Sequence, residues 1–225
     1  MDNVLIMMSK ALVFRKLNKK ELTKLCELAV CRDLKKGQII SLYNDLLPYI
    51  ILVQKGIMVM ARESHKGHSL VLRTFKPGDI FLGHAIIDGG PTPGTLQAIQ
   101  TNTRIYLWHK DHLMPIIKQN PEALWEITTI LMKRMREASN TINQMAFEDV
   151  LTRLASLILD EYYSKDQHQV PRNMTLDDMA ARIGTKREVV CRLLYRLRDK
   201  GIIEITRNQF LIKDIENLKL LAKDI

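Results

Sequence analysis

The stretch TLDDMAARIGTKREVVCRLLYRLR at positions 175–198 decides the fold. Its first half predicts a short helix that begins with a capping box formed by Thr175 and Asp178. Gly184 ends this helix, because glycine adopts the left-handed conformation of a helix C-terminus without strain. A second helix starts almost at once, so the spacing predicts two helices joined by a tight turn.

The second half of the stretch predicts the longer helix of the pair. Thr185 and Glu188 repeat the spacing of a capping box at its start. One side of the helix carries an apolar stripe formed by Val189, Leu193, Leu194 and Leu197, and the opposite side carries Lys186, Arg187, Arg192, Arg196 and Arg198. This pattern is typical of a helix-turn-helix, in which the first helix supports the second and the start of the second enters a major groove.

A β-hairpin is predicted after this pair of helices, with strands at Ile202–Ile205 and Gln209–Ile212 and a polar turn at Thr206-Arg207-Asn208. Such a wing often follows a helix-turn-helix. Basic residues outnumber acidic ones between Lys186 and Arg207, and the whole chain has a net charge of +9. A basic surface attracts phosphate and releases counterions on binding, so the motif favours a polyanionic partner over a merely solvated basic face.

Upstream of this region, residues 121–147 predict one helix of about 40 Å that starts at Pro121. Apolar and small residues recur along it at alternating steps of four and three: Leu124, Thr128, Leu131, Met135, Ala138, Ile142 and Met145. A helix of this length is too long to lie wholly on one small domain. We therefore expect it to pair with its copy in a homodimer. The alternative is a helix packed only on its own domain.

The N-terminal part of the chain changes character after about residue 30. Residues 1–30 predict helices, with Asn18 as a cap. Short apolar runs then alternate with glycine and proline turns as far as Trp108. The runs are Gln38–Leu42, Tyr49–Val53, Ile57–Met60, Leu70–Leu72, Ile80–Leu82 and Arg104–Trp108. Closely spaced strands of this kind predict a β-sandwich or barrel.

Length and composition are those of an ordinary globular protein large enough for two domains. The chain has 225 residues, of which 46% are hydrophobic and 26% charged, and this apolar content excludes disorder. Cys26, Cys31 and Cys191 lack the spacing of a zinc site or a secreted disulfide framework, which indicates a reducing, cytoplasmic environment. No segment has the apolar core of a signal peptide or membrane span, so no membrane partner is expected.

Three segments resemble the CRP/FNR family of bacterial transcription regulators, and the resemblance covers nearly the whole chain. Residues 184–192 (GTKREVVCR) are similar to the recognition segment of that family. Residues 145–155 (MAFEDVLTRLA) are similar to its junction between dimer helix and DNA-binding domain, and residues 76–81 (KPGDIF) to its sensor domain. The resemblance implies an α+β fold with an N-terminal β jelly roll of cyclic-nucleotide-binding type at 1–118, a dimerisation helix at 119–147 and a winged helix-turn-helix domain at 148–225.

The resemblance assigns roles to the predicted recognition helix. Arg187, Glu188 and Arg192 fall on base-reading positions, since arginine can donate two hydrogen bonds to guanine and glutamate can accept one from cytosine. A pure helix cap is the alternative role for Glu188. Thr175, Thr185 and Lys186 are expected to contact phosphates, which orient the protein without specifying sequence. The expected target is a double-stranded, palindromic operator with G·C-containing half-sites about one helical turn apart.

The resemblance also implies an effector pocket in the N-terminal domain. Its candidate residues are Gly83, His84, Gly94, Thr95, Ala138 and Ser139. Cyclic-nucleotide members show Gly-Glu-Leu and later Arg-Ser or Arg-Thr, whereas this chain reads Gly83-His84-Ala85 and Gly94-Thr95. A buried phosphate without an arginine partner would carry a large desolvation cost, and Ala138 replaces the threonine of cAMP-responsive relatives. cAMP is therefore disfavoured as the effector.

Haem or another small molecule remains as a candidate effector. The segment GDIFLGH at residues 78–84 resembles the haem-ligating segment of the carbon-monoxide-sensing member, which makes His84 a candidate haem ligand. Leu82 stands where that member has a cysteine, and a structural role is the alternative for His84. An iron–sulfur cluster is disfavoured, because three scattered cysteines cannot supply four thiolates.

Taken together, these patterns predict a homodimeric, sequence-specific transcription regulator that is controlled by a small-molecule or haem effector. RNA polymerase is an expected partner if the protein is an activator. The alternative is a cyclic-nucleotide-binding-like signalling module that acts through protein partners rather than DNA. We expect no enzymatic activity, because the histidines show no metal-site or catalytic-triad spacing with acids or nucleophiles.

Overall fold

The computed structural model describes residues 2–163, 169–206 and 209–223. The chain forms two compact units, one built from residues 1–62 and 72–137 and the other from residues 63–71 and 138–225. Helices and strands are mixed as the sequence predicts for an α+β protein, with a β-rich N-terminal part, a long helix and a C-terminal helix-turn-helix. No helix in the described ranges is long and apolar enough to cross a membrane.

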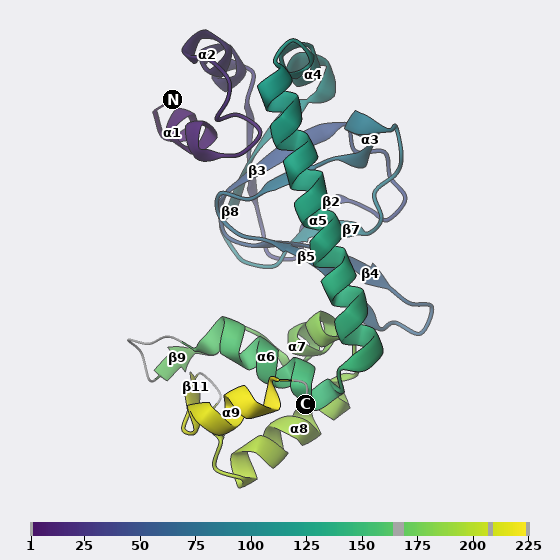
Figure 1. Cartoon of the computed structure of the whole chain (residues 1–225), viewed down its shortest axis with the longest axis vertical. Helices are drawn as coiled ribbons and strands as arrows, with labels where there is room; N and C mark the ends of the chain where they lie inside the picture. Colours follow the sequence, from purple (N-terminus) through teal and green to yellow (C-terminus); the bar gives the residue numbers. More distant parts are fainter. Residues whose placement is uncertain (1, 164–168, 207–208, 224–225) are drawn as a thin grey trace. The chain divides into compact units, whose positions relative to one another are not determined.

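Two four-stranded sheets form the centre of the first unit (Figure 1). One sheet has the strand order β1-β8-β3-β6 and the other β2-β7-β4-β5. The strand bounds are Val30–Leu34 (β1), Ile39–Ser41 (β2), Tyr49–Lys55 (β3), Met58–Glu63 (β4), Ser69–Phe75 (β5), Ile80–Leu82 (β6), Thr95–Ala98 (β7) and Thr103–His109 (β8). One core lies between the sheets, where Ile51 and Val53 of β3 cluster with Met58 of β4 and Leu96 of β7.

Every strand that the apolar runs predict overlaps an observed strand, whereas β1 and β7 were not predicted. Strand β1 is exposed at four of its five residues, so it lacks the alternation of buried and exposed side chains that marks a strand in a sequence. Strand β7 has only four residues and follows a loop rich in glycine and proline. Its pairing with β2 and β4, rather than its own pattern, holds it in the sheet.

Helices cover the outer face of the sheet that contains β3. They are α1 (Asp2–Lys10), α2 (Lys19–Glu27), α3 (His84–Ile87), α4 (Lys110–Lys118) and the first half of α5 (Pro121–Phe147). Asn18 caps α2 through a complete capping box, as predicted. The indole N–H of Trp108 in β8 donates to the carbonyl oxygen of Leu25 in α2 at 2.7 Å. A second core follows, in which Ile50 of β3 and Ile127 of α5 are both buried.

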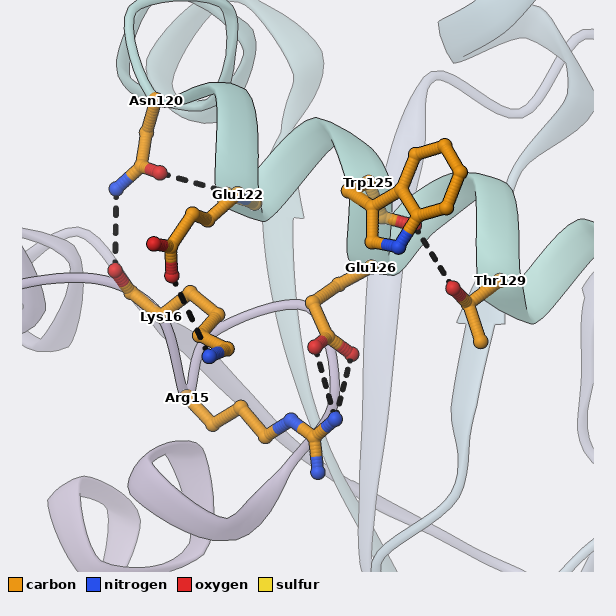
Figure 2. A network of polar contacts seen from close by, with 8 residues as sticks. Arg15, Lys16, Asn120, Glu122, Trp125, Glu126 and Thr129 are labelled. Atoms are coloured by element: carbon orange, nitrogen blue, oxygen red, sulfur yellow. Dashed lines mark hydrogen bonds and ion pairs between the residues drawn. The ribbon is translucent and has the colours of Figure 1, made fainter.

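Polar contacts tie the start of α5 to the N-terminal segment (Figure 2). The guanidinium of Arg15 donates to both carboxylate oxygens of Glu126, at 2.8 and 3.0 Å. Lys16 pairs with Glu122 at 3.3 Å, and the side-chain amide of Asn120 donates to the Lys16 carbonyl oxygen at 3.1 Å. Because Glu126 is almost completely buried, the two hydrogen bonds from Arg15 compensate its loss of hydration.

The second unit contains the C-terminal helices and a three-stranded sheet. Its elements beyond α5 are α6 (Val150–Tyr162), β9 (Gln169–Pro171), α7 (Leu176–Ile183), α8 (Arg187–Asp199), β10 (Ile203–Ile205), β11 (Gln209–Ile212) and α9 (Ile215–Leu221). Strands β10 and β11 form the predicted antiparallel wing, and β9 adds to its edge. The ring of Tyr162 in α6 stacks on Phe210 in β11 with centroids 4.5 Å apart, which docks the wing on the helices. The predicted turn residues Arg207 and Asn208 lie outside the described residues.

Asp149 separates α5 from α6 and caps the latter, since its carboxylate accepts a hydrogen bond from the Thr152 N–H at 2.7 Å. This bond holds the pKa of Asp149 below its ordinary value of 3.8. Replacing the residue in Asp149→Ala should lower the free energy of unfolding by about 1 kcal/mol at neutral pH, measured by urea denaturation. Asp149→Asn should retain most of the stability, because asparagine is an equally good cap.

The same carboxylate predicts a pH dependence. A group with a lowered pKa in the folded state stabilises the fold above its unfolded pKa, and this contribution disappears as the pH falls through the folded pKa. The difference between wild type and Asp149→Ala should therefore shrink below about pH 4. A difference that stayed constant down to the lowest accessible pH would show that ionisation of the carboxylate does not contribute to the stability of the cap.

Candidate nucleic-acid interface and effector site

Helices α7 and α8 form the predicted helix-turn-helix. The Thr175 hydroxyl accepts from the Asp178 N–H at 3.1 Å, and the Asp178 carboxylate accepts from the Thr175 N–H at 2.8 Å. The capping box predicted at the start of α7 is therefore confirmed. Gly184 ends the helix with a φ of 64°, the left-handed conformation that glycine adopts readily.

The predicted cap of the second helix is wrong. Lys186, not Thr185, is the N-cap residue of α8, and no side chain caps this helix end. The Thr185 N–H instead donates to the Ala180 carbonyl oxygen at 3.0 Å, which closes the end of α7. The tight turn uses Thr185 to finish the first helix, so one residue fewer is left to begin the second. The carboxylate of Glu188 is consequently not engaged in a capping box.

One face of α8 is buried and the opposite face is exposed. Val190, Leu193, Leu194 and Leu197 are buried in a core shared with α6 and α7. Val189, which the sequence placed in this stripe, is only partly buried against the core. Lys186, Arg187, Glu188, Arg192 and Arg196 are all exposed. Packing on α7 therefore fixes which side chains α8 presents to solvent.

A groove runs along the exposed face of α8. Its lining residues are Leu176, Arg187, Glu188, Cys191, Arg192, Tyr195, Arg196, Asp199 and Lys200. The structure thus brings together Arg187, Glu188 and Arg192, the three predicted base-reading residues. Sequence reasoning missed Tyr195, which is half exposed, although its position four residues after Cys191 on the same helical face could have indicated it.

The predicted phosphate-contacting residues lie around the helix starts rather than in the groove. Thr175 precedes α7, while Thr185 and Lys186 form the turn before α8. An exposed ion pair joins Arg187 to Asp177 at 3.7 Å. An ion pair of this kind is worth little in water, so Arg187 can exchange Asp177 for another acceptor at small cost.

Arg153 in α6 connects the end of α5 to the helix-turn-helix. Its Nε donates to the Ile183 carbonyl oxygen at 2.9 Å, and its Nη1 donates to the carbonyl oxygens of Gln144, at 3.2 Å, and Glu148. Carbonyl groups in the last turn of a helix lack donors within their own helix. One planar guanidinium therefore donates hydrogen bonds to backbone carbonyl oxygens at the ends of both α5 and α7.

The effector candidates in the first unit come from both sheets. Gly83 and His84 follow β6, and Gly94 and Thr95 lead into β7. A Cβ at Gly83 would lie 2.3 Å from the Leu47 carbonyl oxygen, so only glycine fits there. A Cβ at Gly94 would lie 2.8 Å from the Ala61 carbonyl oxygen, which likewise leaves no room for a side chain. Ala138 and Ser139 lie further along α5, in the second unit.

His84 lies at the start of α3, with its ring centroid 6.5 Å from that of Phe81. Its Nδ1 atom is buried, and no described residue hydrogen-bonds to it. Burial lowers the pKa of His84 below 6.5, and the positive charge of Arg134 lowers it further. Within the described ranges, no cluster of three histidine, cysteine, aspartate or glutamate side chains could hold a metal ion.

Both parts of the chain match known family models. Residues 31–120 match the cyclic nucleotide-binding domain, and residues 152–221 match the Crp-like helix-turn-helix domain. Together with the recognition helix and its groove, these matches define a DNA-binding transcription regulator. The chain belongs to the CRP/FNR family, as its sequence motifs suggested.

Several relatives match this chain over most of its length. The CRP-like cAMP-activated global transcriptional regulator of Mycobacterium tuberculosis is 24% identical over 85% of this chain and 87% of its own length. The cyclic AMP receptor protein of Thermus thermophilus is 24% identical over 83% of this chain and 85% of its own length. A solved structure described as a regulator of the CRP/FNR family from Eubacterium rectale covers 93% of this chain and 97% of its own, with 20% identity and a TM-score of 0.78. These relatives are transcription regulators rather than enzymes.

The turn of the helix-turn-helix yields a test with a matched control. Gly184 and Gly201 both have left-handed backbones, but a Cβ at Gly184 would also lie 2.8 Å from the Met145 sulfur, whereas a Cβ at Gly201 would meet nothing. Gly201→Ala should cost about 1 kcal/mol of unfolding free energy from backbone strain alone. Gly184→Ala should cost more, because the end of Met145 must move as well.

A double-mutant cycle isolates the contact with Met145. If the added Cβ at residue 184 displaces the Met145 side chain, removing that side chain should remove the extra penalty. In a Met145→Ala background, the loss of unfolding free energy caused by Gly184→Ala should therefore equal that caused by Gly201→Ala, measured by urea unfolding. Equal costs for the two glycine variants in the wild-type background would contradict the prediction.

Proposed function

We propose that this protein is a homodimeric transcription regulator that reads a palindromic operator with α8 and responds to an effector in its N-terminal domain. The observation that carries the proposal is the exposed row of Arg187, Glu188 and Arg192 along one groove, backed by a buried apolar face on the same helix. The two arginines can donate hydrogen bonds to guanine. The Glu188 carboxylate, which does not take part in a capping box, can accept one from cytosine. Thr175, Thr185 and Lys186 would hold the flanking phosphates.

The exposed face of α5 supports a dimer. Leu124, Leu131, Met135 and Ile142 are all exposed, and Ile142 is 69% exposed. They recur at the spacing of a coiled-coil seam, while Ala123, Ile127 and Ile130 bury a different face of the same helix. Exposed apolar residues in such a row are typical of an interface, and a second copy of α5 is the partner with matching periodicity.

We propose an effector other than cAMP. The resemblance to the family implies an arginine for the phosphate near the position of Gly94 in cyclic-nucleotide members, and here the Ala61 carbonyl oxygen leaves no space for a Cβ at that position. The neighbouring Thr95 hydroxyl accepts from the Tyr43 N–H at 3.2 Å, so it could offer a phosphate only its single O–H and no positive charge. A cyclic phosphate at this loop would lack the cation that relieves its desolvation.

Haem is the other effector that the sequence raises, with His84 as its ligand. A ligating histidine usually donates its second ring nitrogen to a carboxylate or carbonyl, and no described residue pairs with the buried Nδ1. The cation Arg134 lies near enough to lower the pKa of His84. These surroundings favour a small molecule over haem iron. A cytoplasmic location and, for an activator, contact with RNA polymerase complete the proposal.

The base-reading role of Arg187 can be tested by operator selection and gel-shift titration. Arg187→Ala should cost about 1–3 kcal/mol on the selected operator and relax the preference at one position of each half-site. Lys186→Ala is the matched control, since a phosphate contact should weaken binding to all sequences equally and reduce the salt slope by about one. If Arg187→Ala weakened binding equally on every DNA sequence, the side chain of Arg187 would not read a base.

The dimer can be tested by sedimentation. The wild-type chain, with a mass of 26.0 kDa, should sediment at twice that mass. Ile142→Asp should shift the protein towards the monomer, because it buries an unpaired charge in the seam. Thr129→Glu lies on another exposed face of α5 and should leave the dimer intact. A monomeric wild type, or an Ile142→Asp variant that remains fully dimeric, would contradict the proposed dimer interface along α5.

A further inference from the structure

Three basic side chains of the first unit have buried nitrogen atoms without a hydrogen-bond partner among the residues that the structure describes. They are Nε of Arg73, Nε of Arg134 and Nδ1 of His84. Arg73 comes from β5, Arg134 from α5, and His84 from the start of α3. Buried polar atoms are nearly always paired in proteins, so each unpaired atom calls for an explanation.

The two arginine side chains are held in place by their other contacts. Arg73 donates from Nη1 to the Glu137 carboxylate at 2.8 Å and lies over the ring of Phe75, 5.2 Å from its centroid. Arg134 donates from Nη2 to the Ile80 carbonyl oxygen at 2.8 Å. Each guanidinium is therefore anchored through one terminal nitrogen while its Nε stays unused. Fixed donors of this kind are suited to a bound acceptor.

Charged groups surround Arg134 on several sides. Burial and the charge of Arg73 lower the pKa of Arg134 to about 10, while the carboxylates of Glu137 and Asp79 act in the opposite direction. His84 is near the same positive charge, and burial lowers its pKa below 6.5. The unused Nε donors of the two guanidinium groups, rather than an excess of charge, therefore mark the site.

We propose that Arg73, Arg134 and His84 form a binding site for a small oxyanion, the phosphate or carboxylate group of the effector. This inference rests on the proposed function, since it names the chemical class of the effector. The site uses cations from β5 and α5 instead of the loop position at Gly94. An oxyanion would accept hydrogen bonds from the unused Nε atoms of both guanidinium groups. The neutral imidazole of His84, protonated at Nδ1, would supply a further donor.

The site can be tested with inorganic phosphate and succinate as probes of the two oxyanion classes. Each is titrated into the full-length protein in Tris-chloride buffer at constant ionic strength, and binding is followed by calorimetry and by the thermal unfolding midpoint. At least one probe should bind and raise the midpoint. Arg73→Met and Arg134→Met should each weaken that affinity about tenfold or more. Arg134→Lys, which keeps the charge, should retain part of the binding.

Two controls separate this site from other basic surfaces. Arg32→Met removes an exposed arginine from the same unit and should leave the affinity unchanged. Arg192→Met removes a cation from the groove on α8 and should leave the thermal shift of the N-terminal domain in place.

The oxyanion site and the proposed function are tested separately, and either can fail without the other. Absence of binding of both probes up to about 10 mM, or equal binding by wild type and Arg134→Met, would overturn the oxyanion site. Gel-shift binding to the operator is measured in parallel. An intact operator complex with no anion binding rejects only this site, and anion binding without any operator complex rejects only the proposed function.

Discussion

The arrangement of the second unit depends on one guanidinium group, that of Arg153. It donates to carbonyl oxygens at Gln144, Glu148 and Ile183, which belong to the end of α5, the junction before α6 and the end of α7. A planar group with five donors can serve several carbonyls at once, which the point charge of a lysine cannot do with fixed geometry. Any change in the last turn of α5 therefore alters hydrogen bonds that also hold α7, and α7 packs against α8.

Burial of one helix face determines which residues α5 and α8 leave exposed to a partner. In each helix one face is buried inside a unit and another face is exposed, with Ile127 and Ile142 as examples in α5 and Leu194 and Arg192 in α8. The exposed face differs in chemistry. It is apolar in α5, which suits a protein partner, and basic in α8, which suits a polyanion. Burial inside the unit thus selects the residues that are presented outside it.

Local signals in the sequence predicted most of the fold. The capping box at Thr175 and the glycine at Gly184 fixed both ends of α7, because they act through neighbouring residues. The cap predicted at Thr185 failed, since the turn engaged that residue in closing α7 instead. Strand β1 escaped prediction because sheet pairing alone defines it. The effector candidates Gly83 and Gly94 could be named from motifs, whereas the unpaired nitrogens of Arg73 and Arg134 emerge only when distant segments are packed together.

The carbonyl oxygen of Ala61 beside Gly94 constrains how this protein could change over evolutionary time. A relative with an arginine at the equivalent loop could lose it by a single substitution and tolerate the glycine. The reverse path is steeper, because any side chain at residue 94 would first require the end of β4 to shift. A single substitution at residue 94 would therefore strain the sandwich, and a side chain there becomes compatible with the fold only together with a second change that moves β4.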